Sequence, residues 1–142
     1  MTATSSAHTW WSGDLATGAG NTQVASSAFP EVPITWAARA EGSATATTPE
    51  ELLAAAHASC YSMALSNELG KNGTPATRLD VDVAVTFVPG TGITTSEISV
   101  VGAVPGVDAK EFEAFAAKAK SECPVSKALA GVAITLESAT LI

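Results

Sequence analysis

The stretch that decides the fold is TTPEELLAAAHASCYSMALSNELG, residues 47–70, and its pattern predicts one long helix. Thr48 is suited to be the N-cap, Pro49 takes the first helical position, and Glu51 stands three residues after the cap. This is a capping-box arrangement, in which the Glu51 carboxylate accepts from the Thr48 backbone N–H. The interior has strong helix formers without glycine or proline, and Gly70 is suited to end the helix.

This predicted helix is apolar around most of its circumference, which indicates a buried helix. At about 100° per residue, Glu50, His57 and Cys60 fall on one stripe roughly 80° wide. Each of the three also has an ordinary structural interpretation. A buried cysteine often serves as a small apolar residue, a histidine on an apolar face is often a hydrogen-bonded core residue, and Glu50 favours the helix dipole.

The composition bounds the class of protein. A chain of 142 residues that is 46% hydrophobic is long enough for one domain with a real core. A net charge of −7 without a basic patch disfavours nucleic acid and anionic membrane surfaces as partners. No apolar run has membrane-spanning length, and residues 1–8 lack the pattern of a secretory signal. Two cysteines in such a chain indicate the reducing cytoplasm, where a disulfide is transient and catalytic.

The rest of the chain predicts a single α+β domain over residues 1–142. The clearest strand is RLDVDVAVTFVP, residues 78–89, whose alternation places Leu79, Val81, Val83, Val85 and Phe87 on one face. The other predicted strands cover residues 9–13, 22–28, 34–40, 93–104 (the hairpin partner of 78–89) and 132–141, and further helices cover residues 108–121 and 124 to about 130.

The second cysteine, Cys123, directly precedes Pro124, which favours the first position of a helix. The positive end of a helix dipole lowers the pKa of a nearby thiol, which would favour a thiolate at Cys123. The alternative is that Cys123 is a loop cysteine without a functional role. Cys60 lies in the middle of its helix and needs a cation or hydrogen-bond donors to become a thiolate. The only arginines are Arg39 and Arg78, and Arg39 lies in the segment that leads to the long helix.

Two cysteine motifs, PEELLAAAHASCYSMAL (residues 49–65) and ECPVSKAL (residues 122–129), resemble the OsmC/Ohr family of peroxide-resistance proteins. The resemblance extends to WSGD at residues 11–14 and VPGVDAKEF at residues 104–112. Arg39 within RAEG, without an arginine near position 18, resembles the OsmC branch of the family.

This resemblance implies a thiol-dependent peroxidase that uses no metal or other cofactor. Cys60 matches the peroxidatic cysteine and Cys123 the resolving cysteine. Arg39 matches the arginine that stabilises the Cys60 thiolate, and Glu50 matches the glutamate that pairs with this arginine. The family forms intertwined homodimers, prefers organic hydroperoxides to hydrogen peroxide, and is recycled by a dithiol such as a lipoylated protein. The resemblance gives His57 no catalytic role.

Helix geometry favours the dimer independently. Ten residues separate Glu50 from Cys60, which is about 15 Å along one helix, so Glu50 cannot act on the thiolate of its own helix. Two antiparallel copies that cross near Ala55 would bring Glu50 of one chain beside Cys60 of the other.

Three other interpretations remain open. Cys60 with His57 as its base is compatible with acyl transfer, although the sequence offers no third group to orient the histidine. A Cys/His metal site is disfavoured because His8 and His57 are the only histidines and no ligand spacing recurs. The third is a non-enzymatic stress protein that binds a small molecule and has inert cysteines.

Overall fold

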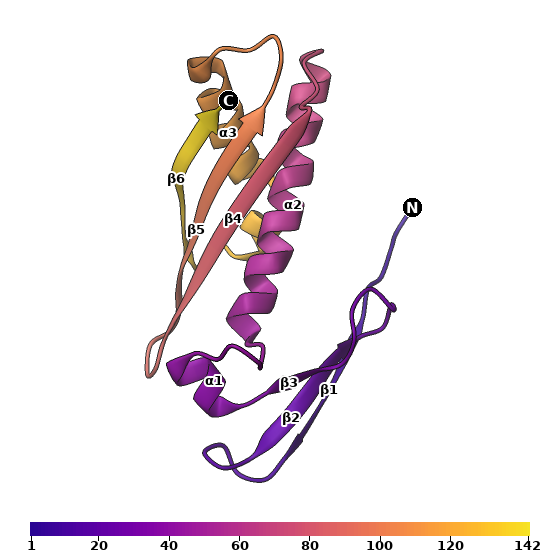
Figure 1. Ribbon diagram of the computed structural model, residues 1–142, viewed down its shortest axis with the longest axis vertical. Helices are drawn as coiled ribbons and strands as arrows, with labels where there is room; N and C mark the ends of the chain where they lie inside the picture. The colour runs from indigo at the N-terminus through magenta and orange to yellow at the C-terminus, as the bar shows by residue number, and fades with distance from the viewer. The chain divides into compact units, whose positions relative to one another are not determined.

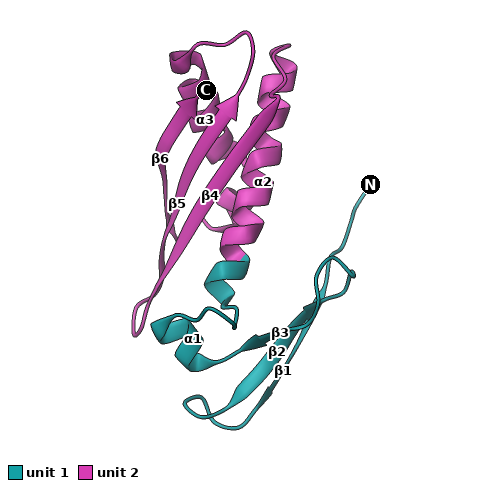
Figure 2. Ribbon diagram, viewed as in Figure 1, with its two compact units in different colours: residues 1–52 teal, residues 53–142 magenta.

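The computed structural model describes all residues from 1 to 142, and the chain forms two compact units, Met1–Leu52 and Leu53–Ile142 (Figure 2). Helices and mostly antiparallel strands build an α+β fold, as the sequence predicts (Figure 1). A single domain over residues 1–142 stays a prediction. None of the helices has the length and apolarity needed to cross a membrane.

The first unit contains a three-stranded antiparallel sheet in the order β1-β2-β3. Its elements are β1 (Ala7–Ser12), β2 (Ala19–Val24), β3 (Val32–Ile34), α1 (Trp36–Glu41) and the first turn of α2 (Pro49–Lys71). Two of these strands correspond to the predicted strands over residues 9–13 and 22–28, with shifted ends.

The strand predicted over residues 34–40 is wrong, because only Ile34 belongs to a strand and α1 begins at Trp36. The Thr35 side chain caps this helix by accepting a hydrogen bond from the Ala38 N–H at 3.0 Å. The capped segment WAARAE then contains alanine, arginine and glutamate, which are good helix formers, so the cap and the composition both favour a helix here. Arg39 therefore stands in the last turn of a helix.

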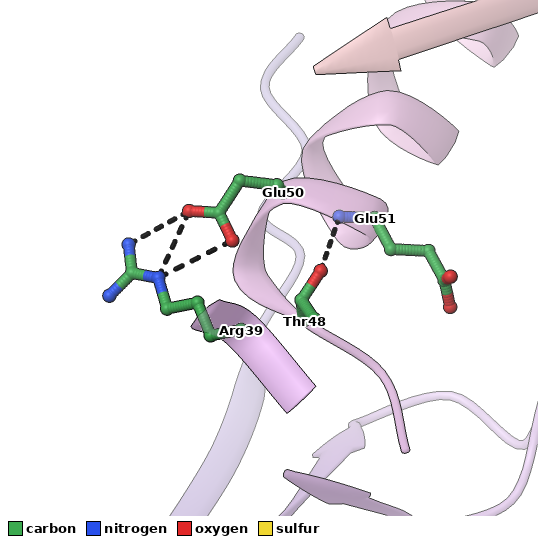
Figure 3. A network of polar contacts seen from close by, with 4 residues as sticks. All are labelled: Arg39, Thr48, Glu50 and Glu51. Atoms are coloured by element: carbon green, nitrogen blue, oxygen red, sulfur yellow. Dashed lines mark hydrogen bonds and ion pairs between the residues drawn. The ribbon is translucent and has the colours of Figure 1, made fainter. Parts of the chain in front are cut away.

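The start of α2 agrees in part with the predicted capping box. Thr48 Oγ1 accepts from the Glu51 N–H at 3.0 Å, as expected for the N-cap (Figure 3). The Glu51 carboxylate, however, accepts from the Thr47 hydroxyl at 3.0 Å rather than from the Thr48 N–H. The reciprocal half of the box is thus replaced by a bond between two side chains, and Glu51 still has the structural role that the sequence assigned to it.

The end of α2 lies beyond the predicted Gly70, because the helix continues to Lys71. The left-handed residue that follows is Gly73, with φ of 78°. Its N–H bonds to the Gly70 carbonyl at 3.0 Å, and the Thr74 N–H bonds to the Leu69 carbonyl at 3.0 Å. These two bonds satisfy carbonyls of the last turn, so Gly73 takes the place in the turn that was predicted for Gly70.

The second unit has a three-stranded sheet in the order β4-β5-β6 (Figure 1). Its strands are β4 (Arg78–Val88), β5 (Gly92–Ala103) and β6 (Ala133–Leu141), and its further helices are α3 (Ala109–Glu122) and α4 (Pro124–Ala128). The predicted hairpin is confirmed, since β4 and β5 pair antiparallel, whereas β6 pairs parallel to β5. The short helix ends about two residues earlier than predicted.

One face of this sheet and the helices form the core. Side chains from α2, β5 and α3 are fully buried against one another and against Cys123, which follows α3. They include Tyr61, Leu65, Leu69, Ile98, Val100, Phe112, Ala116 and Ala119. Asp108 caps α3 in a complete capping box with Glu111. This helix buries Phe112, Ala116 and Ala119 and leads directly into Cys123, so the second cysteine is anchored in the core.

Candidate active site

The second unit packs Cys60 of α2 against the core cluster that contains Cys123, and each thiol shifts the pKa of the other. Both cysteines are free thiols, with Cys60 partly exposed and Cys123 buried. Cys123 lies at the junction of two helices. Its N–H donates to the Ala119 carbonyl at 2.9 Å to end α3, and its carbonyl accepts from the Lys127 N–H at 3.1 Å to begin α4. Pro124 causes this break because it has no N–H with which to continue α3.

The two thiols differ in acidity because they occupy different hydrogen-bonding environments. Burial raises the pKa of Cys60, and its hydrogen bond to Cys123 raises it further. Burial also raises the pKa of Cys123, but hydrogen bonds from Ser126, Cys60 and Val125 outweigh burial and lower the pKa below its ordinary value. The groups within the second unit therefore favour the thiolate on Cys123, and Cys60 needs a further cation to react as a thiolate at neutral pH.

The first unit pairs Arg39 with Glu50 (Figure 3). Arg39 Nη2 donates to Glu50 Oε1 at 2.8 Å, and Arg39 Nε donates to Oε1 at 3.1 Å and to Oε2 at 3.3 Å. The Glu50 side chain is only 7% exposed and the Arg39 side chain 31%. A carboxylate this deeply buried needs a charged partner, and the guanidinium fork provides one with a fixed orientation.

Each predicted pair is thus formed within its own unit: Arg39 with Glu50 in the first, and Cys60 with Cys123 in the second. The action of Arg39 on the Cys60 thiolate stays a prediction.

His57 has two partners that the sequence did not reveal. Its ring is fully buried, with Nδ1 2.7 Å from Ser96 Oγ and Nε2 2.7 Å from Ser126 Oγ. Burial lowers the pKa of His57, which favours the neutral imidazole. Both ring nitrogens are engaged by serines, so neither is available as a base for Cys60. The acyl-transfer interpretation, which required that contact, is wrong for this arrangement.

The sequence alone did not reveal the roles of Ser96 and Ser126, although one of them had a local signal. Ser126 lies three residues after Cys123 within CPVS, a spacing that brings a side chain back toward the start of a helix. Ser96 is separated from His57 by 39 positions and lies on an alternating strand without any distinguishing pattern.

Comparisons with known proteins agree with this architecture. The family model described as OsmC-like protein matches residues 41–137. Peroxiredoxin OsmC of Escherichia coli (strain K12) is 42% identical over 122 residues, which covers 84% of this chain and 85% of that protein. A protein of the same name from Shigella flexneri has the same identity and coverage.

Solved structures share the fold at lower identity. The OsmC-like protein from Mycoplasma pneumoniae is 15% identical with a TM-score of 0.72, covering 100% of this chain and 99% of that chain. The organic hydroperoxide resistance protein OhrB of Bacillus subtilis is 23% identical with a TM-score of 0.64, covering 94% and 97%. The family model spans well over half of the sequence and the E. coli relative is 42% identical, so this chain belongs to the OsmC-like family.

Proposed function

We propose that Cys60 and Cys123 carry the thiol-dependent peroxidase activity of this OsmC-family chain, with Cys60 as the peroxidatic and Cys123 as the resolving cysteine. The observation that supports this assignment is that two free thiols, one partly exposed and one buried, lie in the same core cluster and shift each other's pKa. A peroxide can reach the exposed sulfur, and the second sulfur is already positioned to capture the oxidised product. No residue other than these two has a thiol.

In the first step, the Cys60 thiolate attacks a peroxide oxygen. The O–O bond breaks, an alcohol or water leaves with a proton, and Cys60 is oxidised to a sulfenic acid. Cys123 then attacks the Cys60 sulfur, the S–O bond breaks, and the hydroxide leaves as water. An external dithiol reduces the resulting disulfide by exchange and is itself oxidised to a disulfide.

Arg39 supplies the cation that favours the Cys60 thiolate, and Glu50 holds Arg39 in place through the observed ion pair. Because Glu50 lies about 15 Å from Cys60 along α2, the pair serves Cys60 of the partner subunit in an intertwined homodimer. The exposed side of α2 carries small residues, Ala55, Ala56 and Ser59, together with Met63, which is 67% exposed. Such a surface allows close approach of a second helix.

The preferred substrates are organic hydroperoxides, with hydrogen peroxide a poorer one, and the reductant is a dithiol such as a lipoylated protein. The name of the Bacillus subtilis structure supports this substrate class. The two units act together as one domain over residues 1–142, in the cytoplasm, where thiols are kept reduced between turnovers. The role is defence against oxidative stress.

Intact mass under denaturing conditions tests this proposal. Reduced protein treated with one equivalent of cumene hydroperoxide should lose the two thiol hydrogen atoms. Cys60→Ser should react with no peroxide, whereas Cys123→Ser should complete one round, stop at the sulfenic acid and fail to form the intrachain disulfide. If the native protein keeps its mass and both thiols remain titratable, the peroxidase assignment is refuted and a protein that binds a small molecule without reacting becomes the better interpretation.

A further inference from the structure

Ser126 lies between His57 and the resolving cysteine. Its hydroxyl is 2.7 Å from His57 Nε2. Ser126 also lies three residues after Cys123, in the first turn of α4, where its hydroxyl and backbone N–H help to lower the pKa of the Cys123 thiol. Ser126 is 6% exposed, and His57 and Cys123 are fully buried. The catalytic steps above use neither the histidine nor the serine, although both are held in the core beside a reacting sulfur.

The direction of these hydrogen bonds follows from Ser96, which binds the other nitrogen of the His57 ring. Ser96 is fully buried, and the partner of its hydroxyl is His57 Nδ1. Because a buried hydroxyl proton needs an acceptor, Ser96 donates to Nδ1. The neutral imidazole then carries its proton on Nε2 and donates to Ser126 Oγ. This leaves the Ser126 proton free to point at the Cys123 sulfur.

We propose that His57 and Ser126 are positioning residues for the resolving step: the His57 Nε2–H fixes the Ser126 hydroxyl so that its O–H donates to the Cys123 thiolate as that sulfur attacks the Cys60 sulfenic acid. This inference rests on the proposed peroxidase function. It adds a relay in the order Ser96, His57, Ser126, Cys123, which joins β5, α2 and α4 at the resolving sulfur.

The surroundings of Cys123 explain why one hydroxyl matters. The groups that lower the pKa of Cys123 are all neutral, namely Ser126, the Val125 N–H and the Cys60 thiol. The titratable groups that face it are Cys60 and Tyr61, both from α2, with His57 behind Ser126. Once Cys60 has become a sulfenic acid, it no longer donates its thiol proton, and the Ser126 hydroxyl remains as the side-chain donor.

The electron balance of the step is simple. The Cys123 thiolate gives an electron pair to the Cys60 sulfur and an S–S bond forms. The S–O bond breaks, and the departing hydroxide takes a proton to leave as water. Ser126 keeps its own proton throughout, so it accelerates the step by holding the attacking sulfur as an oriented thiolate.

The test separates the two chemical steps in full-length, pre-reduced protein treated with cumene hydroperoxide. Dimedone trapping with mass detection measures Cys60 sulfenic acid formation, and acid-quenched intact mass measures disulfide formation, each across a pH series. Ser126→Ala and His57→Leu should slow disulfide formation about tenfold, as expected from the loss of one hydrogen bond to a charged group. The pH midpoint of disulfide formation should rise, and sulfenic acid formation should stay within about threefold of wild type.

Three further variants make the result specific. His57→Gln keeps an N–H donor toward Ser126, and Ser126→Thr keeps the hydroxyl, so both should recover most of the rate. Ser121→Ala removes an exposed hydroxyl that donates to the Lys118 carbonyl, and it should behave as wild type. If His57→Leu does not fold, the comparison of Ser126→Ala with Ser126→Thr still decides.

Two outcomes overturn the inference while leaving the peroxidase function intact. In the first, Ser126→Ala forms the disulfide at the wild-type rate with an unchanged pH midpoint. In the second, sulfenic acid and disulfide formation slow equally, which indicates a general structural role. Absence of both sulfenic acid and disulfide in the peroxide-treated wild-type protein is a different result, because it refutes the proposed function itself and the inference with it.

Discussion

The buried ion pair between Arg39 and Glu50 gives the most direct test of how the first unit is held together. In Glu50→Gln, the amide oxygen can replace Oε1, which accepts from Arg39 at 2.8 and 3.1 Å. The amide NH₂ then faces Arg39 Nε at the place of Oε2, where a 3.3 Å bond becomes a donor–donor contact. Hydrogen bonds to charged groups contribute about 1.5–3 kcal/mol, and breaking a buried pair costs about 3–5 kcal/mol. Because the Arg39 side chain is still 31% exposed, we expect a loss near the low end, about 2 kcal/mol.

Urea unfolding measures this loss, since the free energy of unfolding falls linearly with urea concentration. The protein concentration is kept fixed because the apparent stability of an oligomer depends on it. The matched control is Glu51→Gln, one residue along the same helix. Glu51 is exposed and its carboxylate accepts from the neutral Thr47 hydroxyl, so its replacement should cost less than about 1 kcal/mol. Equal losses in the two variants would refute the reasoning. A loss of peroxidase kcat/KM of about tenfold is also expected for Glu50→Gln, because Arg39 loses its fixed orientation.

Two further predictions concern the core that carries the cysteines. In Gly102→Ala, the new Cβ would lie 2.5 Å from Phe112 Cζ, so overpacking should lower the free energy of unfolding by about 1–3 kcal/mol. The control is Gly131→Ala, where the new Cβ would have no atom within 4 Å. Equal thermal midpoints for the two variants would contradict this prediction. Tyr61→Phe removes the hydrogen bond from the buried phenol to the Ala116 carbonyl at 3.0 Å and should cost about 1 kcal/mol in urea unfolding, whereas an unchanged midpoint would show that this bond contributes nothing net.

Much of the fold could be predicted because it depends on local signals. The Thr48 cap and the glycine-free run define α2, and the period-two alternation defines β4 with its hairpin partner β5. Residues 34–40 show the limit of such signals. The sequence predicted a strand there, but the Thr35 side chain accepts a hydrogen bond from the Ala38 N–H and begins a helix instead. In so short a segment, one capping bond decides between the two structures.

For the candidate site too, some features could be predicted from the sequence and others depend on the tertiary structure. The sequence by itself determined which residues have redox and charged chemistry: two cysteines in two recognisable motifs, an arginine before the long helix and a glutamate in its first turn. Only the tertiary structure decided that Cys123 reaches Cys60, and that His57 is bound by serines 39 and 69 positions away. The physical reason is that a side chain's partners depend on which elements pack together, and no local periodicity records that packing. A buried imidazole must satisfy both of its nitrogens, so the core around His57 fixed its neighbours and, through Ser126, the surroundings of the resolving sulfur.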